Sequence, residues 1–369
     1  MPSLYLLIKP VSGKCNMRCG YCFYADEASK RNVAFYGHMN VSILRLIVEM
    51  ALAKAKSECT FAFQGGEPTL AGLKFYQTLV KTVQEKNYKK IPIHYAIQTN
   101  GLTLNREWIS FFIENNFLIG LSLDGNKEIH DSHRRERTGK GTYSNVMRAA
   151  QLLKSSEAEF NILTVVTAQL AKNITKIYGF YLRNNFLYQQ YIPCLEQIGE
   201  QRGQYDYSLT PRVYGEFLCD LFGLWYNSIT NGKAVYIRWF NNLVYILRGF
   251  LPEHCGMTGR CGKYYAVEAD GSVYPCDFYV LDEYRLGYIS DGFEALDQKR
   301  ADLRFIERSL HIDSACKNCR WFTLCRGGCR RDRDEFVDGV LPINYYCEAF
   351  KFFFERCYER LKYIAINLR

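Results

Sequence analysis

The chain has 369 residues, of which 48% are hydrophobic, and this is long enough for one large domain and a smaller one, each with its own core. The formal charge of +9 does not indicate a nucleic-acid-binding protein, because the basic residues are spread along the chain. No run of eighteen apolar residues occurs, and the first residues lack the apolar stretch of a secretory signal. We therefore expect no membrane segment and a cytoplasmic location.

The first two hundred residues alternate short β-rich runs with longer amphipathic stretches, which is typical of a parallel sheet covered by helices. We predict six strands, at residues 4–11, 60–66, 93–100, 118–125, 160–167 and 187–195. Helices are predicted between them, at residues 41–56, 71–86, 105–116, 143–156 and 172–185. Six units are too few for a closed eight-fold barrel, so we expect an α/β fold of the partial (β/α)6, TIM-like kind. In such folds the chemistry lies in the loops at the carboxyl ends of the strands.

The pattern changes after about residue 200. Aromatic helical sequence runs to about residue 250, a cysteine-dense, loop-rich segment extends from Cys255 to Cys347, and a final helix is predicted at residues 345–366. We expect a barrel with its following helices at residues 1–235. A C-terminal cysteine-rich domain with the closing helix is expected at residues 236–369.

Fifteen cysteines are many for a chain without an export signal, because cytosolic thiols are kept reduced, so metal ligation is favoured over disulfides. Cys15, Cys19 and Cys22 follow the first predicted strand with the spacing CxxxCxxC. Three thiolates can hold three irons of a four-iron cluster and leave the fourth iron open to a chelating ligand. Zinc is the alternative, although the loop has no fourth Cys or His close by. The spacing alone leaves both open.

The sequence CNMRCGYC at residues 15–22, together with GGEP at residues 65–68, resembles the signature of the radical S-adenosylmethionine superfamily. The resemblance implies that the open iron binds the amino and carboxylate groups of S-adenosylmethionine, and that one electron cleaves it to a 5'-deoxyadenosyl radical. It further implies five contacts to this cofactor, from Tyr21, Gly66, Ser122, Arg134 and Leu195. Arg134 lies in a charged run beside Arg135 and Arg137, where an arginine is usually solvated.

A second cysteine group reads Cx9Gx4C, a gap, Cx2Cx5Cx3C, a gap and a last cysteine, and it resembles the seven-cysteine signature of the SPASM domain. With Cys255, eight thiolates are available, enough for two fully ligated four-iron clusters. Together with the cluster of the first cysteine group, three [4Fe-4S] clusters are expected. Two zinc ribbons are the alternative. The resemblance assigns Cys255, Cys261, Cys276 and Cys329 to one cluster and Cys316, Cys319, Cys325 and Cys347 to the other, a division that the spacing does not decide. The remaining cysteines, expected to have no chemical role, are Cys59, Cys194, Cys219 and Cys357.

Asp277 directly follows Cys276, and an Asp in such a place is often a turn residue bonded to its own backbone. Over the whole chain, however, the motifs resemble the anaerobic sulfatase-maturating enzymes. That family oxidises a cysteine or serine of a sulfatase motif to Cα-formylglycine. The resemblance implies hydrogen abstraction at Cβ, deprotonation by Asp277 and transfer of an electron to an auxiliary cluster.

The same resemblance implies a sulfatase polypeptide as substrate, a reduced flavodoxin- or ferredoxin-like electron donor, and a monomer. One alternative is a radical enzyme that matures a ribosomal peptide by forming a thioether or by epimerisation. Many such enzymes carry a recognition domain before the barrel, for which a first ligand at Cys15 leaves no room. Another alternative is an electron carrier or zinc scaffold, which would need neither an open iron nor a GGEP loop.

Overall fold

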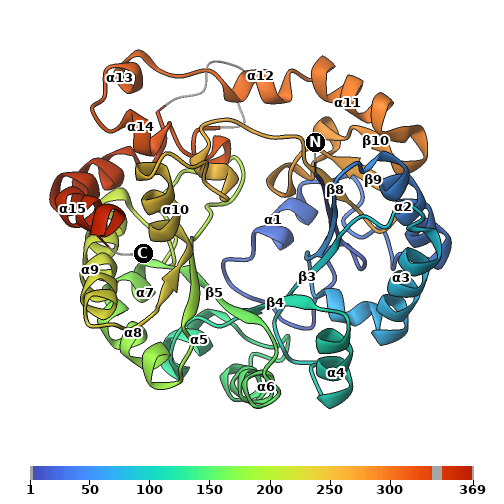
Figure 1. The fold of residues 1–369 in the computed structure, drawn as a ribbon, viewed down its shortest axis with the longest axis horizontal. Helices are drawn as coiled ribbons and strands as arrows, with labels where there is room; N and C mark the ends of the chain where they lie inside the picture. The colour runs from blue at the N-terminus through green and yellow to red at the C-terminus, as the bar shows by residue number, and fades with distance from the viewer. Residues whose placement is uncertain (1–2, 335–342, 368–369) are drawn as a thin grey trace. The chain divides into compact units, whose positions relative to one another are not determined.

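The computed structural model describes residues 3–334 and 343–367 (Figure 1). The chain divides into two compact units, each assembled from segments that are far apart in the sequence. The first unit comprises residues 1–122, 131–160 and 263–305, and the second comprises residues 123–130, 161–262 and 306–369. The boundary between residues 235 and 236 that the sequence suggests stays a prediction.

Seven strands in the described residues of the first unit form one sheet. They are β1 (Leu4–Ile8), β2 (Cys59–Phe63), β3 (Ile93–Thr99), β4 (Phe117–Ser122), β8 (Tyr265–Val267), β9 (Ser272–Tyr274) and β10 (Gly287–Tyr288). β1 to β4 are parallel neighbours, and Leu6 of β1 pairs with Phe61 of β2, both fully buried. β8 pairs in parallel with β1 on its other side, and β9 and β10 continue the sheet in antiparallel pairs. The carboxyl ends of β1 to β4 therefore lie along one edge.

Helices of the first unit connect these strands and cover the sheet (Figure 1). They are α1 (Phe23–Ser29), α2 (Val41–Lys54), η1 (Pro68–Ala71), α3 (Leu73–Lys86), α4 (Arg106–Glu114), α6 (Tyr143–Ser155), η3 (Asp277–Tyr279), η4 (Asp282–Tyr284), η5 (Ile289–Asp291) and α11 (Gly292–Asp302); α5 (Lys127–His133) spans the division between the units. α2 begins where the Asn40 side chain accepts the Ile43 N–H, and it buries Leu44, Ile47 and Val48 on one face.

The second unit contains a short parallel sheet and an aromatic helical core. Its strands are β5 (Phe160–Val166), β6 (Tyr188–Pro193) and β7 (Tyr236–Ile237), paired in that order. Its helices are α7 (Ala168–Lys172), α8 (Ile174–Arg183), α9 (Pro211–Thr230), α10 (Arg238–Leu247), η2 (Cys255–Met257), α12 (Phe305–Ser309), α13 (Ser314–Lys317), α14 (Phe322–Cys325), η6 (Arg330–Asp332) and α15 (Cys347–Asn367). The rings of Phe222, Phe240 and Phe353 join α9, α10 and α15 by edge and stacked contacts.

All six predicted strands are confirmed, as are the five helices between them and the final helix, each within a few residues of its predicted ends. Strands and helices alternate from β1 to α9, which confirms the α/β class of the partial (β/α)6 kind. The segment expected to be loop-rich also contains β8, β9, β10 and α11. None of the helices in residues 3–334 and 343–367 is both long and apolar enough to cross a membrane.

Candidate active site

Cys15, Cys19 and Cys22 lie in the loop between β1 and α1, half-buried and free of disulfides. The sulfur of Cys15 accepts hydrogen bonds from the Met17 N–H at 3.3 Å and from the Asn100 side-chain amide at 3.6 Å. Burial raises the pKa of the Cys15 thiol to about 11, and these donors oppose that rise. Metal ligation requires thiolates, so the loop fits a cluster held by three sulfurs.

The GGEP loop, residues 65–68, contacts the loop that carries Cys15, Cys19 and Cys22, here called the cysteine loop, through backbone atoms. Gly66 has a φ of +56°, and a Cβ built on it would overlap the carbonyl oxygen of Lys14. The next residue, Glu67, donates its N–H to that same carbonyl at 2.8 Å. Glycine is therefore required at position 66 both by the left-handed backbone and by the close approach of the two loops.

Glu67 fixes this loop to the end of β3. Its buried carboxylate accepts hydrogen bonds from the Asn100 N–H at 2.7 Å, from the Thr99 hydroxyl at 2.8 Å and from the Thr69 hydroxyl at 2.6 Å. Burial raises the pKa of Glu67 despite these bonds. Because Asn100 also donates to Cys15, Glu67 positions both loops through one strand end.

The backbone at residues 133–135, at the end of α5, is hydrogen-bonded to the cysteine loop. The Arg18 N–H donates to the Arg135 carbonyl at 2.7 Å, and the Gly20 N–H donates to the His133 carbonyl at 3.2 Å. The intervening Arg134 is 7% exposed, and its guanidinium lies 5.7 Å from the ring centre of Tyr21. Arg134 is therefore buried, unlike the usual arginine of a charged run, which is solvated.

The other predicted cofactor contacts differ in their surroundings. Arg135 and Arg137, the neighbours that the sequence does not separate from Arg134, are both exposed. Ser122 is half-buried and ends β4, on the same edge of the sheet as the GGEP loop. Leu195 is half-buried and follows β6 in the second unit.

Asp277 begins η3 directly after Cys276 and is 5% exposed. Its Oδ2 accepts hydrogen bonds from the Tyr24 hydroxyl at 2.7 Å and from the Gln64 side-chain amide. Its Oδ1 is buried and has no hydrogen-bond partner among the residues that the structure describes. Burial raises the pKa of Asp277, although the Lys9 charge and the hydrogen bonds from Tyr24 and Gln64 act against it. One carboxylate oxygen is thus held and the other is left without a donor.

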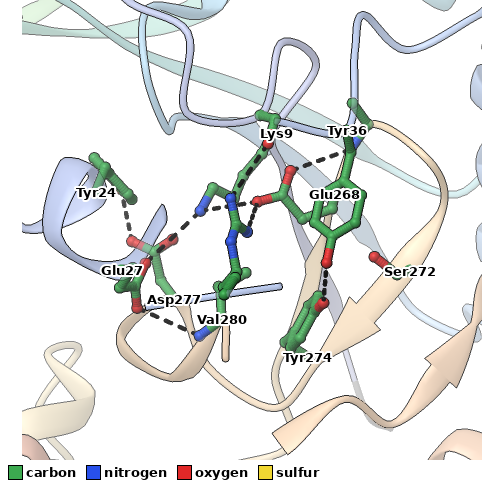
Figure 2. Close-up of polar contacts among 12 residues, drawn as sticks. Lys9, Tyr24, Glu27, Tyr36, Glu268, Ser272, Tyr274, Asp277 and Val280 are labelled. Carbon is green, nitrogen blue, oxygen red and sulfur yellow. Dashed lines mark hydrogen bonds and ion pairs between the residues drawn. The ribbon is translucent and has the colours of Figure 1, made fainter. Parts of the chain in front are cut away.

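A buried group of charges lies beside Asp277, and Figure 2 shows its side chains together. The Lys9 ammonium is 3.3 Å from Glu268 and 3.9 Å from Glu27, and the Arg31 guanidinium is 2.6 Å from Glu268. Burial raises the pKa of Glu27 to about 8. Although burial opposes it, the charges of Lys9 and Arg31 lower the pKa of Glu268. Three carboxyl groups face two cations here, so the group favours retention of one proton at neutral pH.

Seven of the predicted cluster ligands lie in the second unit, and four of them line a single pocket. These four are the ones that the resemblance assigns to one cluster, namely Cys316, Cys319, Cys325 and Cys347. None forms a disulfide, and all are half-buried. Four free thiols around one hollow fit a fully ligated four-iron cluster.

The other three ligands of the second unit also lie near one another. Burial raises the pKa of the Cys329 thiol well above its usual value, and the neighbouring Cys255 and Cys261 thiols add to this rise. A Cβ at Gly256 would stand 3.4 Å from the Cβ of Cys329. The fourth predicted member of this set, Cys276, belongs to the first unit.

Across residues 3–334 and 343–367, no three His, Cys, Asp or Glu side chains converge closely enough to hold one metal ion. A four-iron cluster does not demand such convergence, because each thiolate binds a different iron.

The residues around Asp277 are the ones that the sequence analysis missed. Gln64 directly precedes the GGEP motif and Tyr24 lies two positions after Cys22, so their nearness to motifs was a usable signal. Lys9, Glu27 and Glu268 belong to no motif, and their grouping arises from the pairing of β8 with β1 and from α1.

Comparison with known proteins identifies two family regions. Residues 10–170 match the radical SAM superfamily, and residues 255–320 match the SPASM model, described as an iron-sulfur cluster-binding domain. The chain is 46% identical to a cysteine-type anaerobic sulfatase-maturating enzyme of Clostridium novyi, over 100% of this chain and 99% of that protein. It is 31% identical to a serine-type anaerobic sulfatase-maturating enzyme of Bacteroides thetaiotaomicron, over 95% of this chain and 89% of the relative.

The fold has a close match among solved structures. The structure of native anSMEcpe with bound AdoMet and the Cp18Cys peptide superposes with a TM-score of 0.95 and 45% sequence identity, covering 100% of both chains. This match confirms the predicted partial barrel with a C-terminal SPASM domain. The chain therefore belongs to the anaerobic sulfatase-maturating enzymes, a family of radical S-adenosylmethionine proteins that carry a SPASM iron-sulfur domain.

Proposed function

We propose that this protein oxidises a cysteine in a short sulfatase motif to Cα-formylglycine, and that serine is the poorer substrate. The higher identity to cysteine-type than to serine-type relatives, 46% against 31%, supports this preference. The observation that carries the chemistry is the buried Asp277, whose Oδ2 is held by two donors while Oδ1 lacks one.

The first step requires a cofactor held next to the substrate. Cys15, Cys19 and Cys22 would hold the first cluster, while Tyr21, Gly66, Ser122, Arg134 and Leu195 would contact S-adenosylmethionine. When bound, S-adenosylmethionine would supply a 5'-deoxyadenosyl radical for hydrogen abstraction at the substrate Cβ, and an auxiliary cluster would supply the acceptor for the second electron. The rigid contact between the GGEP and cysteine loops supports this arrangement, because radical transfer depends on fixed positions.

Asp277 accepts the proton that the substrate thiol must lose. A base works best when its pKa is near the operating pH, and burial moves the pKa of Asp277 upward in that direction. Tyr24 and Gln64 orient the carboxylate through Oδ2, which leaves Oδ1 to take the proton. Lys9 keeps the charged form accessible in the interior by its positive charge.

Three four-iron clusters predict about twelve iron atoms per loaded chain. Replacing Cys316 and Cys319 together by alanine is expected to lower this content to about eight, because two of the four thiols in one pocket are lost. Iron and acid-labile sulfide analysis of anaerobically reconstituted protein measures the change. Cys59→Ala, at a buried cysteine of β2, is the control and should keep the full content. Equal iron in the double variant and the control would contradict the assignment.

Arg134→Gln is expected to weaken binding of S-adenosylmethionine about ten-fold or more, because a buried charged donor beside Tyr21 is lost. Arg135→Gln removes the same charge from an exposed neighbour and should leave binding close to that of the unmodified protein. Equilibrium dialysis with labelled cofactor and cluster-loaded protein compares the two. Equal weakening in both variants would count against a specific contact.

We also propose a reduced flavodoxin- or ferredoxin-like protein as the electron donor and a monomeric enzyme. The function is tested by incubating the anaerobically reconstituted protein with S-adenosylmethionine, a reductant and a sulfatase peptide, followed by mass spectrometry. Formylglycine in the cysteine peptide together with 5'-deoxyadenosine is the expected result, with slower conversion of the matched serine peptide. Deoxyadenosine with both peptides unchanged would favour a maturase of ribosomal peptides. Absence of deoxyadenosine from iron-loaded protein would reject radical chemistry.

A further inference from the structure

Two cysteines outside the predicted cluster ligands form a pair between α9 and α15 of the second unit. Cys219 of α9 and Cys357 of α15 line the same hollow, and each thiol affects the pKa of the other. The two helices are in close contact along this line: a Cβ at Gly215 would lie 3.2 Å from the Cα of Ala349. The backbone there holds the helices together, so the pair is a fixed feature of the packing.

The pair opens on a hollow of about 500 Å³ at the surface of this unit. Cys219 is half-buried and Cys357 is buried, so a small molecule in the hollow reaches Cys219 first. Arg356 and Arg360 also line the hollow, against the single carboxylate of Asp220. The volume suits a small molecule, and the excess of guanidinium groups favours an anionic one.

The surroundings favour one thiolate within the pair. Interaction with the Cys219 thiol lowers the pKa of Cys357, burial opposes this, and the positive charges of Arg360 and Arg356 add to the lowering. The Arg360 guanidinium donates to the Cys357 sulfur at 3.7 Å. Cys59 is a contrast within the same chain, because burial alone raises the pKa of its thiol to about 12. Reactive thiols occur beside cations, whereas buried thiols in apolar surroundings are inert.

We propose that Cys219 and Cys357 form a thiol–disulfide exchange site. It reacts with a small anionic disulfide, and a reversible disulfide bond between Cys219 of α9 and Cys357 of α15 results. Because Cys219 is the cysteine that the small molecule reaches, it passes its proton to the Cys357 sulfur and attacks a sulfur of the small disulfide as thiolate; the S–S bond of that molecule breaks, and half of it leaves as thiolate. The second cysteine then displaces the other half as thiol, and the Cys219–Cys357 bond forms. The protein loses two electrons, and the small disulfide is reduced to two small thiols.

In the experiment, cluster-loaded protein is treated anaerobically with glutathione disulfide, and free thiols are then blocked in acid with N-ethylmaleimide. Tryptic peptides are mapped to find which cysteines have become linked. Cys219 and Cys357 fall in tryptic peptides 213–233 and 357–360, each with a single cysteine, so a linked pair is unambiguous. We expect this linked pair to accumulate with time and to disappear after dithiothreitol. The peptide that carries Cys59, residues 57–74, should stay fully blocked by maleimide. Absence of the linked pair overturns the proposal.

Two further measurements separate a built site from accidental oxidation. Replacing Arg356 and Arg360 together by glutamine is expected to slow linkage about three-fold, since a ten-fold loss of thiolate is partly offset by greater nucleophilicity. In this variant Cys357 falls in tryptic peptide 352–362, again with a single cysteine. Equal rates in this variant and the unmodified protein would overturn the role of the guanidinium groups. Iron content is followed in parallel and should stay constant. Linkage that appears only as iron is lost would overturn the proposal, because it would report unfolding.

Discussion

Asp277→Asn is expected to lower formylglycine formation by about 10²–10⁴-fold while 5'-deoxyadenosine is still produced. The amide preserves the shape of the side chain and can still accept the Tyr24 hydrogen bond, but it cannot take a proton from the substrate. In the proposed mechanism, cofactor cleavage precedes this proton transfer and depends on the cysteine loop, so it should persist. Both products are measured in the same anaerobic reaction, by mass spectrometry of the peptide and by chromatography of the nucleoside.

Glu27→Gln is the matched control, because it makes the same chemical change at a buried carboxyl of the same charged group. The glutamine oxygen can keep the hydrogen bond from the Val280 N–H, which Glu27 accepts at 3.3 Å. We expect this variant to retain most of its formylglycine formation. If both variants lose activity equally, the net charge of the group matters and Asp277 is not the base.

Gly66→Ala is expected to reduce S-adenosylmethionine cleavage about 100-fold or more. The added Cβ overlaps the Lys14 carbonyl oxygen, so the GGEP loop must move away from the cysteine loop. A displacement of about 1 Å at a reacting centre is enough for a loss of this size. The measurement is the initial rate of 5'-deoxyadenosine formation per iron, which corrects for incomplete cluster loading.

The control for this change is Gly232→Ala in the second unit. Gly232 also has a positive φ, +79°, but no atom lies within 4 Å of a Cβ built there. It therefore carries the strain of a left-handed alanine, about 1–2 kcal/mol, without the overlap. We expect cleavage per iron to be nearly unchanged. A similar loss in both variants would assign the effect to backbone strain, and full activity of Gly66→Ala would show that the loops can separate.

The sequence does not show which of three neighbouring arginines is buried. Arg134, Arg135 and Arg137 have the same charge in the same run, and spacing does not distinguish their environments. In the folded chain, Arg134 is buried against Tyr21 because the backbone on either side of it pairs with Arg18 and Gly20. Those hydrogen bonds join positions more than a hundred residues apart, and no local pattern encodes them.

By itself the sequence determined the class of the fold, the strands from β1 to β6 and the two cysteine groups, because periodicity and ligand spacing are local properties of the chain. The tertiary structure decided what surrounds Asp277. Pairing of β8 with β1 brings Glu268 to Lys9, and η3 brings Asp277 to Tyr24. It also decided that Cys219 and Cys357, equivalent in sequence to Cys59, lie together beside two arginines. Burial and charge at a residue depend on segments distant in the sequence, so they follow from the packed fold alone.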